Sequence, residues 1–309
     1  MNMQPALDIK NIKDIVQLAV KEDISEGDIT SKIFVPEGSE SEGTFTANET
    51  GIIAGLPVAK YVFSHLDKDL VFTSNIEDGS RIKKGAIIAN VKGSTTSILS
   101  AERLVLNFLQ RLTGIATLTN KFVEKIKGYK AQIMDTRKTT PGWRYLEKYA
   151  VRVGGGVNHR MGLYDQILVK DNHLNIIKTK QQEIGVKELF KENGIFSGLV
   201  KKARKQKANK MLIEVEIEDL NHVKNVLDAG IDIIMFDNMK PAKISEAIKM
   251  VREYEKVRDT TTGKATLTEA SGNINLENVE AYARTGVDRI SVGAITHSAR
   301  ALDISLEII

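Results

Sequence analysis

Charged and small polar residues follow several short apolar runs in the second half of the chain. Where parallel strands alternate with helices, the carboxyl ends of the strands meet at one edge of the sheet, and active sites lie at that edge. The same placement after five or six successive runs favours one shared polar site over chance exposure of polar loops. The residues concerned are 135–138 (DTRK), 170–173 (KDNH), Glu216, 237–238 (DN), 271–273 (SGN) and 293–294 (GA).

Four cations would enter this site: Arg137, Lys138, Arg160 and Lys170, with His159 beside them. Bringing them together costs several kcal/mol of mutual repulsion unless anions offset it. Arginine forks suit carboxylates and phosphates. A polyanionic ligand is therefore expected, and surface salt bridges are the alternative.

Two carboxylates, Glu216 and Asp237, are expected on adjacent strand ends. They suit Mg²⁺ held through water, or sugar hydroxyls. A general acid–base role is disfavoured, since neighbouring lysines and arginines are expected to keep both ionised. The alternative is salt bridges to Lys138 or Lys170.

The small residues in 271–273 and 293–294 are expected to precede helices beginning near Leu276 and Thr296. Backbone N–H groups at helix N-termini bind phosphate, often in the last loops of a barrel. The interpretation is a phosphate cradle, with simple turns as the alternative.

The first half of the chain has the mixed pattern of an α+β domain. Apolar spacing predicts helices over 7–22 and 97–113. Between them we predict short strands at 44–47, 52–54, 70–73 and 86–91.

After about residue 115 the pattern becomes strands alternating with charged helices, which predicts a parallel sheet. No Gly-x-Gly-x-x-Gly follows the first strand, so a barrel is preferred to a dinucleotide-binding sheet. The predicted strands are 131–134, 166–169, 212–216, 232–236, 266–269 and 289–292, and the predicted helices are 220–229, 243–254 and 276–285.

Composition narrows the class of protein. The 309 residues include no cysteine, which excludes disulfides and thiolate metal sites. No apolar run reaches the ~18 residues of a membrane span, and the N-terminus carries acidic residues where a signal peptide would be apolar, so a cytoplasmic protein without membrane contact is expected. The net charge of +4 and the basic run 201–210, interpreted as a solvated helix face, do not indicate nucleic-acid binding.

Segment 135–174 (DTRKTTPGWRYLEKYAVRVGGGVNHRMGLYDQILVKDNHL) closely resembles the central part of quinolinate phosphoribosyltransferase, the carboxylating nicotinate-nucleotide pyrophosphorylase. The similarity continues in 100–117, 213–220, 233–239 and 269–308, and in the N-terminal motifs GDIT (27–30) and GIIAGLPVA (51–59).

The resemblance implies an α/β protein with an N-terminal α+β sandwich over 1–114, against which a C-terminal helix 297–309 packs, and an incomplete parallel α/β barrel over 115–296. It implies a pentosyltransferase of de novo NAD biosynthesis that converts quinolinate and 5-phosphoribosyl 1-diphosphate into nicotinate mononucleotide, diphosphate and CO₂. The implied cofactor is Mg²⁺, held mainly through diphosphate and water near Glu216 and Asp237.

The resemblance also implies roles for individual residues. Lys138, Glu216 and Asp237 would be catalytic. A homodimer is implied, with Arg103 reaching the partner's site. The implied substrate-binding residues are Arg103, Thr136, Arg137, Lys138, His159, Arg160, Lys170, Glu216, Asp237, Ser271, Gly272, Asn273, Gly293 and Ala294.

Segments 175–200 and 255–266 are longer than the family pattern and are expected to be surface loops. Two rival functions stay open: a related phosphoribosyltransferase-like protein associated with molybdate transport, and a non-catalytic phosphosugar-binding protein. The cations Arg137, Lys138 and Arg160 argue against the first, because quinolinate needs both carboxylates bound. Glu216 and Asp237 argue against the second, because a pure anion binder gains nothing from carboxylates.

Overall fold

The computed structural model describes residues 6–180, 189, 194–206, 211–257 and 265–308. The chain divides into two compact units, the first made of 1–123, 138–158 and 293–309 and the second of 124–137 and 159–292. The first unit includes the C-terminal segment, which the sequence also predicted to pack with the N-terminal domain, and it further includes 138–158, which the sequence assigned to the barrel. Parts of the predicted loops 175–200 and 255–266, and the end of the basic run 201–210, lie outside the described residues.

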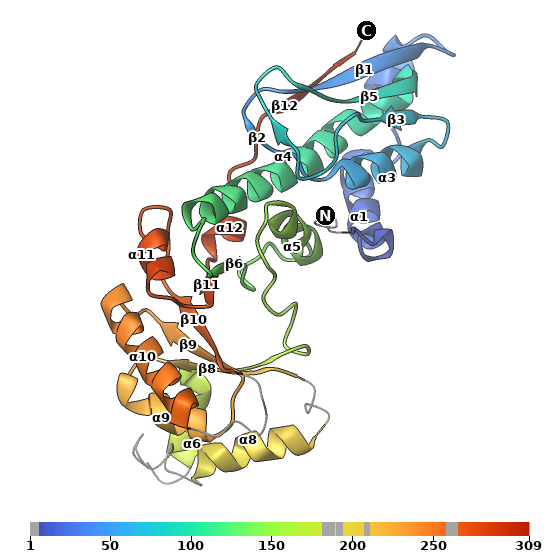
Figure 1. Cartoon of the computed structure of the whole chain (residues 1–309). Coiled ribbons are helices and arrows are strands. Elements are labelled where there is room, and N and C mark those ends of the chain that lie inside the picture. The colour runs from blue at the N-terminus through green and yellow to red at the C-terminus, as the bar shows by residue number, and fades with distance from the viewer. Residues whose placement is uncertain (1–5, 181–188, 190–193, 207–210, 258–264, 309) are drawn as a thin grey trace. The chain divides into compact units, whose positions relative to one another are not determined.

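The first unit holds a four-stranded antiparallel sheet, in the order β12-β1-β5-β3, and several helices (Figure 1). Its strands are β1 Glu40–Ala47, β2 Gly51–Ile52, β3 Val71–Thr73, β4 Arg81–Ile82, β5 Ile87–Ser94 and β12 Ile304–Ile308, with β2 and β4 forming a separate pair. Its helices are η1 Ile9–Asn11, α1 Lys13–Asp23, α2 Ile29–Phe34, α3 Leu56–Leu66, α4 Thr95–Lys125, α5 Arg144–Val153 and α12 Ala294–His297.

Aromatic side chains form the core between this sheet and α3. Phe45 of β1 is fully buried and lies edge-on to Phe63 of α3 and Phe72 of β3, with ring centroids 6.1 and 6.0 Å away. Alternate residues of a strand point to one face, and the burial of β1 alternates accordingly. This explains why the sequence pattern located these strands.

Helix α4 confirms the predicted helix 97–113 and extends it to Lys125, because the apolar spacing continues through Ile115 and Phe122, which are both buried. Gly114 lies in this helix where the C-terminal segment crosses it. A Cβ at Gly114 would collide with the carbonyl of Arg300, so the absence of a side chain permits the crossing.

The predicted C-terminal helix over 297–309 is wrong. Helix α12 ends at His297, and residues 304–308 form β12, which pairs with β1 from Gly43 opposite Ile308 to Ala47 opposite Ile304. An edge strand presents unpaired backbone N–H and C=O groups, which another strand satisfies and a helix does not. This pairing, between segments more than 250 residues apart, outweighs local helical spacing.

The second unit is built on a six-stranded sheet in the order β6-β11-β10-β9-β8-β7, with every pairing parallel (Figure 1). The sheet ends at β6 and β7, as expected for an incomplete barrel. Its strands are β6 Gln132–Met134, β7 Ile167–Val169, β8 Ile213–Ile217, β9 Ile233–Asp237, β10 Leu267–Ser271 and β11 Arg289–Ser291. Its helices are α6 Asp171–Lys180, α8 Ile195–Lys205, η3 Leu220–His222, α9 Val223–Asp228, α10 Pro241–Val257 and α11 Val279–Arg284.

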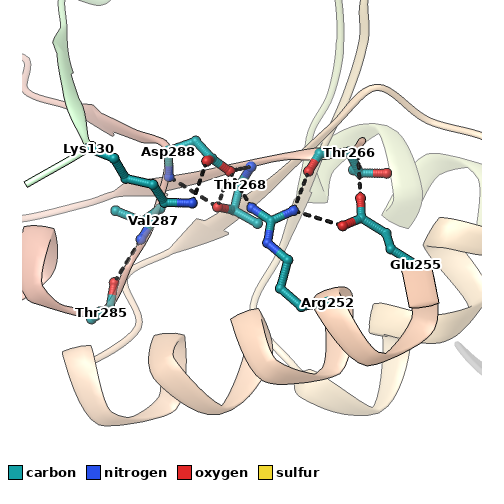
Figure 2. A network of polar contacts seen from close by, with 8 residues as sticks. All are labelled: Lys130, Arg252, Glu255, Thr266, Thr268, Thr285, Val287 and Asp288. Atoms are coloured by element: carbon teal, nitrogen blue, oxygen red, sulfur yellow. Dashed lines mark hydrogen bonds and ion pairs between the residues drawn. The ribbon is translucent and has the colours of Figure 1, made fainter. Parts of the chain in front are cut away.

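A polar network fastens α10 to the amino ends of β10 and β11 (Figure 2). The Asp288 carboxylate accepts hydrogen bonds from Lys130 Nζ (2.8 Å), Arg252 Nη2 (2.8 Å) and the Thr268 hydroxyl (2.7 Å) and N–H (2.9 Å). Arg252 also pairs with Glu255 at 2.9 Å. These contacts lie at the end of the sheet opposite the candidate site, so they hold the scaffold and leave the carboxyl ends of the strands for chemistry.

Within the described ranges, every helix is too short or too polar to cross a membrane.

Candidate active site

The carboxyl edge of the six-stranded sheet collects the predicted carboxylates. Glu216 is the fourth residue of β8 and lies opposite Met235 of β9, while Asp237 ends β9 opposite Ser271, the last residue of β10. The parallel register therefore confirms that these side chains come from neighbouring strand ends.

Glu216 forms an ion pair with Lys170, which follows β7. Lys170 Nζ lies 3.1 Å from Glu216 Oε2, and the Glu216 side chain is 7% exposed. Burial raises the pKa of Glu216, Lys170 lowers it, and the charges of Asp237 and Asp171 add to the rise. The net direction is upward, because burial outweighs the effect of Lys170 on the pKa of this carboxyl. The salt bridge foreseen as an alternative is present.

The loop after β9 and the loop after β10 contact each other at Gly272. Its φ of +96° is left-handed, as are those of Asn238 (+52°) and Asn273 (+53°). Asn238 N–H donates to the Ser271 carbonyl at 2.9 Å, and Asn273 Nδ2 donates to Asn238 Oδ1 at 3.1 Å. A Cβ at Gly272 would lie 2.8 Å from Asn238 N, so glycine is required both by conformation and by space.

The turn after β10 leads into a capped helical turn before α11. Helix α11 begins at Val279 rather than near Leu276. The Asn275 carboxamide accepts hydrogen bonds from the N–H groups of Glu277 (3.1 Å) and Asn278 (3.0 Å), and the Asn275 carbonyl accepts one from Val279 N–H at 3.0 Å, so Asn275 caps the helical turn that leads into α11. Residues 271–273, where the sequence predicted a phosphate cradle, precede this capped turn, and Gly272 and Asn273 there have left-handed backbones.

Arg137 and Arg160 are close enough to influence each other. The Arg160 side chain is nearly buried, and its Nη1 donates to the Gln166 carbonyl at 3.2 Å. Burial lowers the pKa of Arg160, and the charge of Arg137 lowers it further. The two guanidinium groups are therefore near each other, and the binding of an anion by them stays a prediction.

His159 faces protein groups on both sides of its ring. Its Nδ1 accepts a hydrogen bond from Arg160 N–H at 2.8 Å, which orients that segment. Its Nε2 lies 3.0 Å from Glu214 Oε2 and 3.5 Å from Glu269 Oε1, two fully buried carboxylates. A direct contact between His159 and substrate thus stays a prediction. The contacts described for the His159 ring are with Arg160 N–H and with the carboxylates of Glu214 and Glu269.

Four predicted site residues belong to the first unit. Arg103 is exposed on α4, and Lys138 is exposed before α5. The Lys138 carbonyl accepts a hydrogen bond from the Thr296 hydroxyl at 2.9 Å. Gly293 precedes α12, which begins at Ala294, close to the predicted helix start. A Cβ at Gly293 would lie 3.0 Å from Lys138 Cδ, so these two residues pack directly together.

Models of a single family match almost the whole chain. The family described as quinolinate phosphoribosyl transferase, N-terminal domain, matches residues 28–113, and its C-terminal domain matches residues 115–307. The chain belongs to the quinolinate phosphoribosyltransferase family. The two family models meet at residues 113–115, next to the domain boundary that the sequence predicted between 114 and 115.

Relatives within the quinolinate phosphoribosyltransferase family cover the chain along its length. A probable nicotinate-nucleotide pyrophosphorylase [carboxylating] of Bacillus subtilis is 41% identical, over 96% of this chain and 93% of its own length. Quinolinate phosphoribosyltransferase [decarboxylating] 1b of Nicotiana tabacum is 39% identical, over 98% and 84%. The crystal structure of NadC from Streptococcus pyogenes has a TM-score of 0.86 at 33% identity, with 98% of each chain covered. The fold is therefore shared with solved members of the family.

Sequence reasoning missed the buried pair Glu214 and Glu269. Burial raises the pKa of each to about 7; Arg289 opposes the rise at Glu214, and the charge of Glu214 adds to it at Glu269. Gln166 Nε2 donates to Glu214 at 2.5 Å, and Ser291 Oγ donates to Glu269 at 2.5 Å. The signal for Glu214 is a glutamate within an apolar strand, as in IEVEI at 213–217, and the signal for Glu269 is its place at the end of the predicted strand 266–269.

Two groups of residues in this quinolinate phosphoribosyltransferase family member offer metal ligands. Among the residues with described positions, His159, Glu214 and Glu269 place ligand atoms within 4.8 Å of one another, but all three are buried. Glu216 and Asp237 supply two carboxylates on adjacent strand ends. Mg²⁺ keeps several waters and binds through one or two carboxylates plus substrate phosphates, so the strand-end pair suits the ion that the sequence predicted.

Proposed function

We propose that this chain catalyses the reaction for which its family is named. The 5-phosphoribosyl group passes from 5-phosphoribosyl 1-diphosphate to the ring nitrogen of quinolinate, with release of diphosphate. The 2-carboxylate leaves as CO₂, and nicotinate mononucleotide remains. The observation that supports this proposal is that a chain of this family brings Arg137 and Arg160 close together and places Glu216 and Asp237 on neighbouring strand ends.

The proposal assigns the cationic residues to quinolinate, which is a dianion. Arg137 and Arg160 suit its two carboxylates through bidentate hydrogen bonds, each worth roughly 1.5–3 kcal/mol when charge-assisted. Lys170 adds a cation whose position is set by Glu216. Thr136, Lys138 and His159 complete the proposed quinolinate-binding group.

The proposal assigns the other strand ends to the phosphoribosyl donor. Glu216 and Asp237 bind ribose hydroxyls, and their charge stabilises the oxocarbenium-like ribose that forms as diphosphate leaves. The 5-phosphate is bound by the small residues of the last two loops, namely Ser271, Gly272, Asn273, Gly293 and Ala294.

Mg²⁺ bound near Glu216 and Asp237 would neutralise the charge that develops on the departing diphosphate. The chain's own contribution is to hold the pyridine nitrogen against the ribose carbon and to exclude other orientations. The nitrogen–carbon bond forms as the carbon–diphosphate bond breaks. The electron pair of the broken carbon–carboxylate bond stays on C2 as a carbanion, which the adjacent ring cation stabilises until a proton takes the place of CO₂.

The proposal includes a homodimer in which Arg103 serves the site of the partner subunit. A cytoplasmic location also remains part of it.

Turnover tests the proposal. The purified protein is incubated with quinolinate carrying labelled carbon in its 2-carboxylate, with the phosphoribosyl donor and Mg²⁺. We expect labelled CO₂ and nicotinate mononucleotide in equal amounts, dependent on both substrates. Quinolinate or phosphosugar binding without CO₂ would favour the non-catalytic alternative, and absence of quinolinate binding would favour the transport-associated one.

A further inference from the structure

Arg111 of α4 joins three parts of the first unit through one guanidinium group. It donates to Glu147 Oε1 on α5 and to the carbonyls of Thr296 and Ala299, each at 2.7 Å. A planar fork with several donors suits such convergent acceptors, whereas the single ammonium of lysine does not. The Arg111 side chain is 25% exposed and Glu147 is fully buried.

Glu147 carries the contact onward to the segment before α5. The same Oε1 accepts a hydrogen bond from the Thr140 hydroxyl at 2.9 Å, and Oε2 accepts one from Thr140 N–H at 3.2 Å. A buried carboxylate is stable only when paired and hydrogen-bonded. Arg111 supplies the countercharge, so the attachment of Thr140 depends on it.

Thr296 carries a second contact to the same segment. While its carbonyl accepts from Arg111, its hydroxyl lies 2.9 Å from the Lys138 carbonyl, to which it donates. The main chain is therefore held at Lys138 and again at Thr140, and both attachments lead back to Arg111. The side chain of Lys138 is exposed, while hydrogen bonds fix the main chain at Lys138 and at Thr140, on either side of Thr139.

We propose that Arg111 and Glu147 are positioning residues, which act through Thr296 and Thr140 to orient Lys138 for quinolinate. This proposal rests on the role that the proposed function gives to Lys138. Neither residue needs to touch substrate. Their effect is to remove freedom from the Lys138 main chain before substrate arrives, and preorganisation of this kind is reflected in binding and turnover.

A purely structural role is the competing explanation, and the chain offers a matched control for it. Arg204 on α8 also donates to two carbonyls, Met211 and Gly230, at 3.1 Å each, and to one carboxylate, Asp232, at 2.7 Å. Its side chain is 31% exposed, close to the value for Arg111. These contacts lie at the amino ends of β8 and β9, away from the carboxyl edge.

The experiment compares Arg111→Met, Glu147→Gln and Arg204→Met with the parent protein. Thermal melts report folding, calorimetry reports quinolinate affinity, and hydrogen exchange reports the Thr140 amide. We expect Arg111→Met and Glu147→Gln to weaken quinolinate binding by roughly ten- to 10²-fold, the effect of losing one charge-assisted hydrogen bond, and to speed Thr140 exchange. Arg204→Met should lower the melting temperature similarly but leave affinity and Thr140 exchange unchanged.

A double-mutant cycle with Lys138→Ala completes the test. If Arg111 acts through Lys138, adding Arg111→Met to Lys138→Ala changes quinolinate affinity by less than about twofold, whereas independent effects would multiply. Multiplying effects, or equal loss of affinity in Arg204→Met, would overturn the positioning role. Failure of the proposed function is distinguishable, because the parent itself would then not bind quinolinate, while faster exchange at Thr140 would still report the contact network.

Discussion

Replacing Gly272 with alanine tests how the turn after β10 is built. Alanine must adopt a φ of +96° there, and left-handed conformations cost an L residue roughly 1–2 kcal/mol. The added Cβ would also lie 2.7 Å from Asn238 Cγ and 2.8 Å from its backbone N. Because the backbone nitrogen cannot move aside alone, relief of this overlap adds about 1–3 kcal/mol, the usual cost of overpacking.

Gly286→Ala is the matched control for this change. Gly286 has a φ of +84°, but a Cβ there meets no atom within 4 Å. It therefore carries the conformational cost of roughly 1–2 kcal/mol without the overlap. We expect Gly272→Ala to lose roughly 2–5 kcal/mol in total and Gly286→Ala only the smaller amount.

Denaturant unfolding of the two variants measures this difference, and steady-state kinetics report the site. Gly272→Ala should also raise KM for the phosphoribosyl donor, because Asn238 and Asn273 shift with the turn, whereas Gly286→Ala should leave KM unchanged. Equal stability losses in the two variants, with unaltered KM in both, would refute the argument that contact with Asn238 shapes this loop.

Three further predictions concern other parts of the molecule. Asp288→Asn should lower the free energy of unfolding at neutral pH by roughly 1.5–3 kcal/mol. Burial acts to raise the pKa of Asp288, but hydrogen bonds from the side chains around it outweigh burial and lower the pKa. The contribution of Asp288 to stability is therefore present above about pH 3.8 and should fade as the pH falls below that value. Thermal melts from pH 7 to pH 2 in which the parent and the variant do not converge would contradict this. Glu216→Gln and Asp237→Asn should reduce kcat much more than quinolinate affinity, because their proposed partners are ribose and metal, and unchanged kcat at saturating substrate and Mg²⁺ would exclude that role. Mixing inactive Arg103→Ala and Lys138→Ala proteins under conditions of subunit exchange should restore activity, up to about half the parental value per mixed dimer, whereas no recovery after demonstrated exchange would mean that Arg103 serves its own subunit.

Local pattern determined much of the fold. The apolar spacing of α4 and the short apolar runs of the barrel identify their elements because each buries one face along its own length. Placing Glu216, Asp237 and Ser271 at strand ends then followed from a general property of parallel sheets. The family motif at 135–174 added the reaction, which no periodicity reveals.

Other features depend on partners distant in sequence, and only the tertiary structure decided them. Strand β12 exists because β1 has a free edge, and the pairing spans most of the chain. His159 meets Glu214 and Glu269 only after three separate segments have folded together. Burial then raises the pKa of both carboxylates, and burial is a property of the packed molecule.

Lys138 and Arg111 differ in whether the sequence alone can identify them. Lys138 could be selected from the sequence, because a cation after a predicted strand indicates an anion site by position alone. Arg111 is one of several polar residues on a helix, and its role depends on the carbonyls of Thr296 and Ala299, almost 190 residues away. Side-chain type and strand position determine which residues can meet a substrate. The long-range hydrogen bonds that fix the positions of those residues cannot be recognised in the sequence, because their acceptors are backbone atoms that every residue carries alike. They form only when the chain is folded.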